Sequence, residues 1–116
     1  MIETRLGDFE EVIMLIVGIL DVDDAYSFRI VQEFKSQTGR TVSIGAVHAT
    51  LDRLETKGFL RSEIKDGTSA RGGRRKRIYK ITALGKRIIK ESMDFKVALW
   101  KQYPAFAGKF NMSFDV

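Results

Sequence analysis

Residues 43–81 read SIGAVHATLDRLETKGFLRSEIKDGTSARGGRRKRIYKI, and this segment predicts a helix followed by a β-hairpin. Ser43 is a favourable N-cap, and Gly58 marks the end of the helix. Between them, apolar side chains recur at helical spacing at Ile44, Val47, Leu51 and Leu54. Two runs rich in β-forming residues, 60–65 and 77–81, then flank a glycine-rich connection.

Two further helices are expected before this segment. Apolar residues at helical spacing predict one over 6–20, and because it is apolar on nearly all sides it must be covered on more than one face. A second is expected over 25–37, ended by Gly39. The short glycine-containing connection to the helix at 44–57 makes this pair a candidate helix-turn-helix.

One long helix is expected after the hairpin, with Thr82 as its cap, residues 83–103 as its body and Pro104 as its stop. Its apolar side chains cover about half of the circumference, whereas a stripe of roughly 100° suffices for one partner surface. We therefore expect it to pack both on its own domain and on a second copy of the chain. The predicted dimer interface consists of Phe9, Ile13, Ile88, Ile89, Met93, Phe95, Lys96, Leu99, Trp100 and Tyr103.

The positive charge of the chain is concentrated in the hairpin. The formal net charge is +5, from 20 Lys+Arg and 15 Asp+Glu. Between Lys65 and Lys80 there are seven basic residues and one acid, Asp66, which leaves 13 basic and 14 acidic residues elsewhere. A basic patch of +6 on a nearly neutral body indicates a polyanionic partner, most commonly double-stranded DNA.

The predicted fold class is mainly α (α+β): a winged helix-turn-helix with a two-stranded basic wing and a long C-terminal dimerisation helix. We expect residues 1–82 to form the DNA-binding domain, 83–103 the dimerisation helix and 104–116 a tail, for which the sequence predicts no definite structure.

Composition excludes several classes of site. The chain has no cysteine and one histidine, which excludes disulfides, thiolate chemistry and a multi-histidine metal site. Asp52 and Glu55 share a helix side, but Arg53 and Lys57 beside them favour a surface of ion pairs. We expect no enzyme, metal or cofactor. The longest apolar run, 12–20, is too short for a bilayer, and acids stand where a secretory signal needs bases, so a cytoplasmic protein is expected.

The helix at 44–57 is the predicted recognition helix. Small residues on its outer face would let the backbone approach the floor of the major groove, unless they are small because another helix crosses there. His48 lies at the flank, where it either touches a phosphate or packs at the core edge. Wing arginines suit phosphate contacts. The predicted DNA-binding residues are Ser43, Gly45, Ala46, His48, Ala49, Thr50 and Arg53 on the helix and Arg71, Arg74, Arg75, Lys76 and Arg77 in the hairpin.

Four motifs together resemble the PadR family of bacterial transcriptional regulators. They are LGDFEE at 6–11, DAY at 24–26, GAVHATLDRLE at 45–55 and RGGRRKR at 71–77, and Ile81-Thr82 followed by Gly85 fits the same pattern. The resemblance implies a winged helix-turn-helix, a C-terminal dimerisation helix and usually a repressor. Tyr26, within the second motif, joins the predicted DNA-binding residues.

The chain departs from the pattern of this family at three positions. Members usually carry tyrosine where this chain has His48, and glycine where it has Ser27. Multidrug-binding members stack flat ligands on a tryptophan at the position of Lys96, whereas Trp100 lies about one turn later. Lys96 therefore either extends past apolar neighbours into water or, with Trp100, binds a small anionic aromatic effector.

The sequence thus predicts a DNA-binding transcriptional regulator, a homodimeric repressor on an inverted repeat that a small effector releases. The alternative is a winged-helix adaptor that binds proteins and reads no DNA sequence. A basic wing favours the first, because an adaptor needs no +6 segment.

Overall fold

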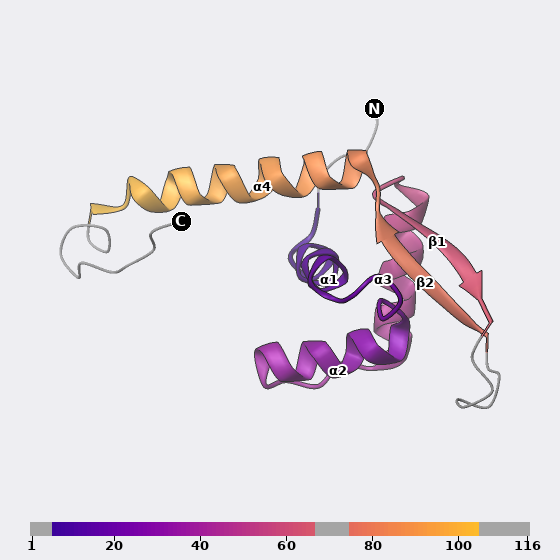
Figure 1. Cartoon of the computed structure of the whole chain (residues 1–116). Coiled ribbons are helices and arrows are strands. Elements are labelled where there is room, and N and C mark those ends of the chain that lie inside the picture. The colour runs from indigo at the N-terminus through magenta and orange to yellow at the C-terminus, as the bar shows by residue number, and fades with distance from the viewer. Residues whose placement is uncertain (1–5, 67–74, 105–116) are drawn as a thin grey trace.

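The structure, a computed structural model, describes residues 6–66 and 75–104. Its elements are α1 (Asp8–Ile19), α2 (Ser27–Thr38), α3 (Ile44–Thr56), β1 (Leu60–Lys65), β2 (Lys76–Ile81) and α4 (Ala83–Lys101). Figure 1 shows three helices gathered beside a β-hairpin, with α4 crossing above them. The predicted winged helix-turn-helix is confirmed.

The core lies where α1, α2 and α3 meet the hairpin. α1 contributes Ile13 and Met14, α2 contributes Ile30, and α3 contributes Leu51, all with no exposed surface. β1 and β2 pair antiparallel from Leu60 opposite Ile81 to Lys65 opposite Lys76. The apolar stripes that the sequence predicts on the three helices therefore face one another.

α2 begins two residues later than its apolar spacing predicts. The amide of Tyr26 donates to the carbonyl of Asp24 at 2.9 Å, and the carbonyl of Ala25 accepts from the amide of Tyr79 at 2.9 Å. These bonds use Asp24–Tyr26 as a turn that holds β2, so the helix starts at Ser27.

α4 is joined to the body by hydrogen bonds of Thr82, the residue that precedes its first turn. Thr82 caps α4 by accepting from the amide of Gly85 at 3.0 Å, and its hydroxyl donates to the carbonyl of Gly58 at 2.7 Å. Gly58 has a φ of 82°, which favours glycine where α3 gives way to β1. The junction fixes the direction in which α4 leaves the hairpin.

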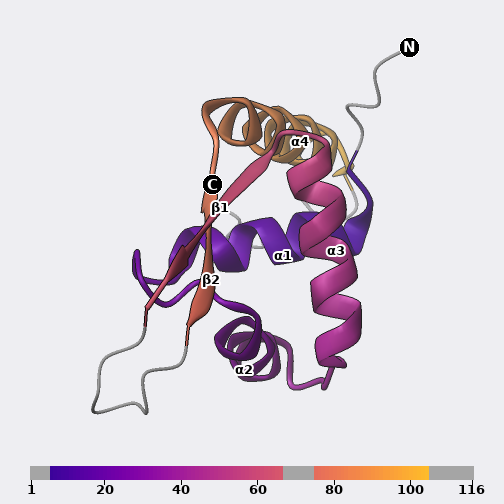
Figure 2. The ribbon, with the colours of Figure 1, turned by 90° about the vertical axis from the view of Figure 1, so that its right-hand side faces the viewer.

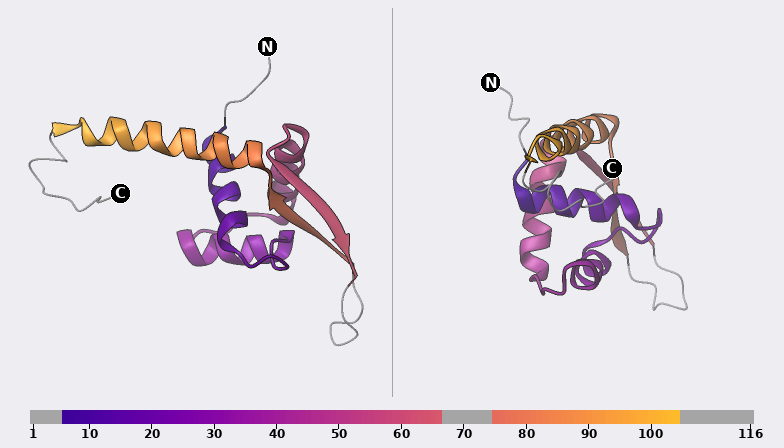
Figure 3. Two further views of the ribbon diagram at one scale, coloured as in Figure 1. Left: turned by 45° about the horizontal axis from the view of Figure 1, so that its top comes forward. Right: turned by 90° about the vertical axis from the view of Figure 1, so that its left-hand side faces the viewer.

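The C-terminal half of α4 extends beyond the body, and the left-hand view of Figure 3 shows the same overhang from a second direction. Leu84, Ile88 and Ile89 in its first half pack on the core. None of the helices within residues 6–66 and 75–104 is long and apolar enough to cross a membrane.

Candidate nucleic-acid interface

α3 presents a solvent-facing side that begins at its N-terminus. Ser43 caps the helix, its hydroxyl accepting from the amide of Ala46 at 3.0 Å. Gly45, His48 and Ala49 are exposed, whereas Val47 and Leu51 on the opposite side are buried. In Figure 2 this N-terminal end of α3 lies beside α2, at the end of the body opposite α4.

No described neighbour requires the residue at position 45 to be a glycine. A methyl group added there would meet only the Ser43 hydroxyl, at 4.0 Å. No helix of the described residues crosses α3 at this point, which answers the alternative left open by the sequence.

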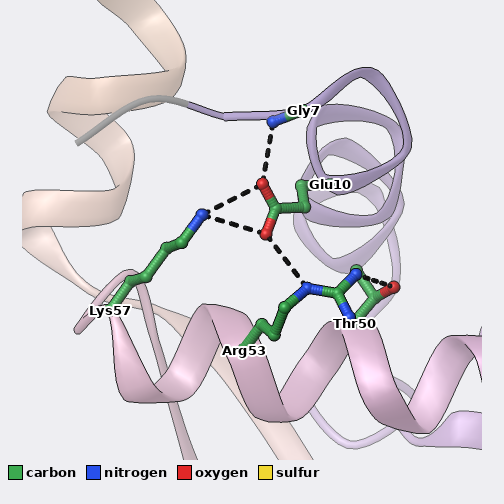
Figure 4. Close-up of polar contacts among 5 residues, drawn as sticks. All are labelled: Gly7, Glu10, Thr50, Arg53 and Lys57. Carbon is green, nitrogen blue, oxygen red and sulfur yellow. Dashed lines mark hydrogen bonds and ion pairs between the residues drawn. The ribbon is translucent and has the colours of Figure 1, made fainter. Parts of the chain in front are cut away.

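Two of the predicted DNA-binding residues on α3 contact each other. Thr50 is 1% exposed, so its prediction as a DNA contact is wrong, because its side chain is buried. Its hydroxyl accepts from a terminal nitrogen of Arg53 at 3.1 Å. Arg53 Nε lies 3.5 Å from Glu10, so this guanidinium is turned toward α1 (Figure 4). The Arg53 side chain is still 55% exposed, so its role in DNA binding stays a prediction.

Glu10 is the centre of that contact. Its carboxylate accepts from the amide of Gly7 at 2.8 Å and from Lys57 Nζ, 3.1 Å from both oxygens (Figure 4). Burial alone would raise the pKa of Glu10, but the Gly7 amide, Lys57 and Arg53 together outweigh it and lower the pKa. The carboxylate stays ionised and ties α1 to the C-terminal end of α3.

His48 is exposed and contacts the first residue of α2. Its Nδ1 lies 3.2 Å from the hydroxyl of Ser27, which is 9% exposed. The two positions at which the chain departs from the family pattern on this surface are therefore in direct contact, a pairing that spacing along the sequence did not reveal.

The far end of the hairpin, where Lys65 lies opposite Lys76, is attached to the turn before α2. Lys65 on β1 forms an ion pair with Asp23 at 2.7 Å, and Lys76 Nζ lies 4.0 Å from the centre of the Tyr26 ring. With the bond between Tyr79 and Ala25, these contacts fix the wing relative to the helix-turn-helix. They bring together Tyr26 and Lys76, two residues predicted separately to bind DNA.

Acids near the strands neutralise part of the predicted basic patch. Lys80 lies 3.3 Å from Glu63, and Arg75 lies 3.1 Å from Asp66. Both partners of the second pair are largely exposed, so water screens it. Arg77 donates to the Ser62 hydroxyl at 3.0 Å. Arg71 and Arg74 lie outside the described residues.

The overhanging part of α4 carries exposed apolar side chains. Phe95 is 64% exposed, Leu99 51% and Tyr103 49%, all three belonging to the predicted dimer interface. On α1, Leu15 and Ile19 are also exposed, and the sequence analysis did not single them out. Ile88, Ile89, Met93 and Trp100 are half-buried.

For Ile13 the prediction that it belongs to the dimer interface is wrong, and Phe9 packs against another residue of the same copy. Ile13 has no exposed surface and belongs to the core of a single copy. Phe9 is half-buried, with its ring 5.7 Å from that of Phe34 in an edge-on arrangement. The helical spacing of α1 placed both on an apolar side but did not distinguish the faces of a helix that is apolar all round.

Lys96 already has an anionic partner. Its ammonium forms an ion pair with the buried carboxylate of Glu11, which also accepts from the Ser92 hydroxyl. The Lys96 side chain is still half exposed, so the effector site at Lys96 and Trp100 stays a prediction. Trp100 lies edge-on to Tyr103, with 6.2 Å between the ring centres.

A comparison with known families gives a match over most of the folded part. The pattern of the transcriptional regulator PadR-like family matches residues 16–91, from the middle of α1 into α4. The chain belongs to this family. No curated protein sequence matches it significantly.

Solved structures of other PadR-like proteins share the fold. A PadR family transcription regulator from hypervirulent Clostridium difficile is 26% identical, with a TM-score of 0.63 over 84% of this chain and 98% of that one. A PadR-like transcription factor from Bacteroides fragilis is 25% identical, with a TM-score of 0.62 over 88% of both chains. Bacillus subtilis PadR, solved in complex with operator DNA, is 18% identical, with a TM-score of 0.60 over 75% of this PadR-like chain and 48% of its own.

Proposed function

We propose that this PadR-like protein is a homodimeric transcriptional repressor that binds an inverted repeat in double-stranded DNA. The observation that carries the proposal is the outer face of α3 beside the far end of the basic hairpin, where Lys65 pairs with Lys76. Both lie at the end of the body away from α4 (Figures 1 and 2). A small-residue face next to cationic strands suits a duplex, which offers a groove and its flanking phosphates.

In this proposal the N-terminal half of α3 enters the major groove. Gly45, Ala46 and Ala49 allow close approach of the backbone, and Ser43 and His48 supply polar contacts. Tyr26 and Lys76 lie where the wing meets the helix-turn-helix, and Arg75 and Arg77 follow the sugar-phosphate backbone. Because this face has few long side chains that read base edges, DNA shape would carry part of the specificity.

Two copies joined through α4 would place two recognition helices on one face of the duplex. The exposed Phe95, Leu99 and Tyr103 supply an apolar surface that a second α4 could cover. A two-fold axis then requires half-sites about 34 Å apart, one helical turn of DNA. The corresponding complex of Bacillus subtilis PadR with operator DNA supports this mode of action. The cytoplasm would be its place of action.

Selection of bound duplexes from a random pool, at one stated salt concentration, tests the proposal. We expect an inverted repeat with half-sites spaced by about one helical turn. Retention of no duplex would contradict DNA binding and favour the adaptor alternative, and retention without sequence preference would contradict an operator-specific repressor.

The wing contributes a second readout in the same assay. Replacing Arg75 and Arg77 with alanine removes two cations per copy, so the dependence of log affinity on log salt should flatten by about two units for each copy bound. Arg87→Ala with Lys90→Ala removes the same charge from α4 and serves as the matched control. Equal slopes for the two double variants would exclude a wing contact.

A further inference from the structure

His48 and Ser27 form an arrangement that the proposed function does not explain by itself. His48 is exposed on the proposed DNA-binding side of α3, yet its Nδ1 is held 3.2 Å from the hydroxyl of Ser27 at the start of α2. Ser27 is 9% exposed. An exposed imidazole held at one nitrogen by a nearly buried hydroxyl has a restricted ring orientation, and Nε2 on the other edge is the nitrogen left for an outside partner.

The hydrogen bond also limits the protonation states that suit DNA. A phosphate oxygen only accepts hydrogen bonds, so the imidazole must present Nε2–H to it. This is the case when the Ser27 hydroxyl donates to Nδ1 of a neutral ring, and also when a protonated ring donates from Nδ1 to the hydroxyl oxygen. The protonated form adds a positive charge next to the phosphate, so a phosphate contact favours it.

We propose that His48 binds a DNA phosphate through Nε2–H, that Ser27 is the positioning residue for its ring, and that the contact takes up a proton. This inference rests on the proposed function, because it specifies one contact of the same DNA-binding surface.

The charged and titratable groups around this pair do not fix the ring in its place. These groups are Asp24 and Tyr26 on the turn before α2, Arg29 on α2, Asp52 one turn further along α3, and Lys76 on β2. Lys76 is directed at the Tyr26 ring, and Arg29 is paired with Glu33 at 2.9 Å. Both cations therefore have partners of their own, and the hydroxyl of Ser27 is the group that lies within hydrogen-bond distance of Nδ1.

The single histidine of the chain makes the proposal testable in solution. Histidine is the side chain whose charge ordinarily changes between about pH 5 and 8. We would measure binding to a fluorescent random-sequence duplex of about 30 base pairs, long enough for two half-sites, from about pH 7.5 down to 5.5. The wild type should bind more tightly by up to about tenfold per pH unit for each bound copy, the limit for one proton per His48, and so by up to about a hundredfold for a dimer.

Four variants separate the contact from a structural role. His48→Gln cannot gain a proton and should bind weakly with a flat pH profile. Ser27→Ala should bind less tightly while keeping part of the pH dependence, and adding it to His48→Gln should change nothing further. Gln37→Ala, at the other end of α2, is the control with a wild-type profile. Thermal unfolding of each variant verifies that it is folded.

The outcomes distinguish this inference from the proposed function. If the wild type binds the duplex in a salt-dependent way but His48→Gln has the same affinity and pH profile, the His48 contact is refuted and DNA binding stands. If His48→Gln loses the pH dependence while Ser27→Ala matches the wild type, the positioning role of Ser27 is refuted. A wild type that binds no duplex refutes both.

Discussion

Two consecutive acids of α1 make buried contacts with two different elements. Glu10 pairs with Lys57 and Arg53 at the end of α3, and Glu11 pairs with Lys96 on α4. Neighbouring positions on a helix point about 100° apart, so one short helix reaches both partners. α1 therefore connects the proposed recognition helix with the proposed dimerisation helix through single side chains.

Glu10→Gln should destabilise the fold at neutral pH. The change removes the carboxylate that accepts from Lys57 and pairs with Arg53, at a cost of about 1–3 kcal/mol in the free energy of unfolding. Because the folded-state pKa of Glu10 is lowered, its stabilisation is fully present above the ordinary value of 4.5 and is lost as the pH falls through the lowered folded-state pKa. Urea unfolding should show that the wild type has a larger free energy of unfolding than Glu10→Gln at pH 7, and that this difference becomes smaller in acid.

The control for this prediction is Asp94→Asn on α4, which removes an exposed carboxylate paired with Lys90. Its stability should stay close to that of the wild type, because exposed pairs contribute little. If Glu10→Gln and the wild type differed in free energy of unfolding by the same amount at pH 7 and in acid, the charge of the Glu10 carboxylate would contribute nothing to stability.

Individual side chains were the hardest part to predict from the sequence. The spacing of α3 correctly separates buried Val47 from exposed Ala49, but Thr50 lies at the boundary and proves buried. The partners of Arg53 and Lys96 are acids of α1, far away along the chain. Helical periodicity gives the side of a helix on which a residue lies, and it does not give the charge that a distant element brings there.

At the scale of elements, the junction between β2 and α4 depends on one glycine. A Cβ at Gly85 would lie 2.1 Å from the carbonyl oxygen of Phe59, which is backbone and cannot move aside cheaply. Gly85→Ala should therefore cost about 2–3 kcal/mol of stability, measured by thermal or urea unfolding.

Gly45→Ala is the matched helical control, because its methyl group meets nothing closer than 4.0 Å. Alanine should stabilise α3 there by about 0.5–1 kcal/mol. If Gly85→Ala proved as stable as Gly45→Ala, the close contact between α4 and Phe59 would not exist in solution.

The elements themselves were predictable because each has its own local signal. Apolar spacing, Ser43 and Thr82 as caps, and Gly39 and Gly58 as stops give the helices and their order. The starts of α1 and α2 and the end of α4 each differ by two residues from the expected ranges, and at the start of α2 the Ala25 carbonyl bonds to β2 instead of continuing a helix. Such a bond forms only after the hairpin has folded against the turn, so no local pattern encodes it.

At the scale of the whole molecule, the overhang of α4 is the feature that one copy leaves incomplete. Phe95 and Leu99 are more than half exposed on a helix whose first half is packed on the core. Exposed Leu15 and Ile19 on α1 extend the apolar surface of the body. A second copy could cover this surface without any change in the fold of the first. A charge placed on this surface should therefore oppose association and leave the fold intact.

Leu99→Glu should convert the dimer into monomers that remain folded, because the side chain is 51% exposed in one copy and a buried charge would oppose association. Sedimentation equilibrium measures the change, and the slope of log DNA affinity against log salt should fall to about half, since one copy contacts half the phosphates. Phe95→Glu should behave in the same way. Lys101→Glu, on the opposite side of α4, adds a negative charge but should remain dimeric. A dimeric Leu99→Glu protein with an unchanged salt slope would show that the two copies associate through another surface.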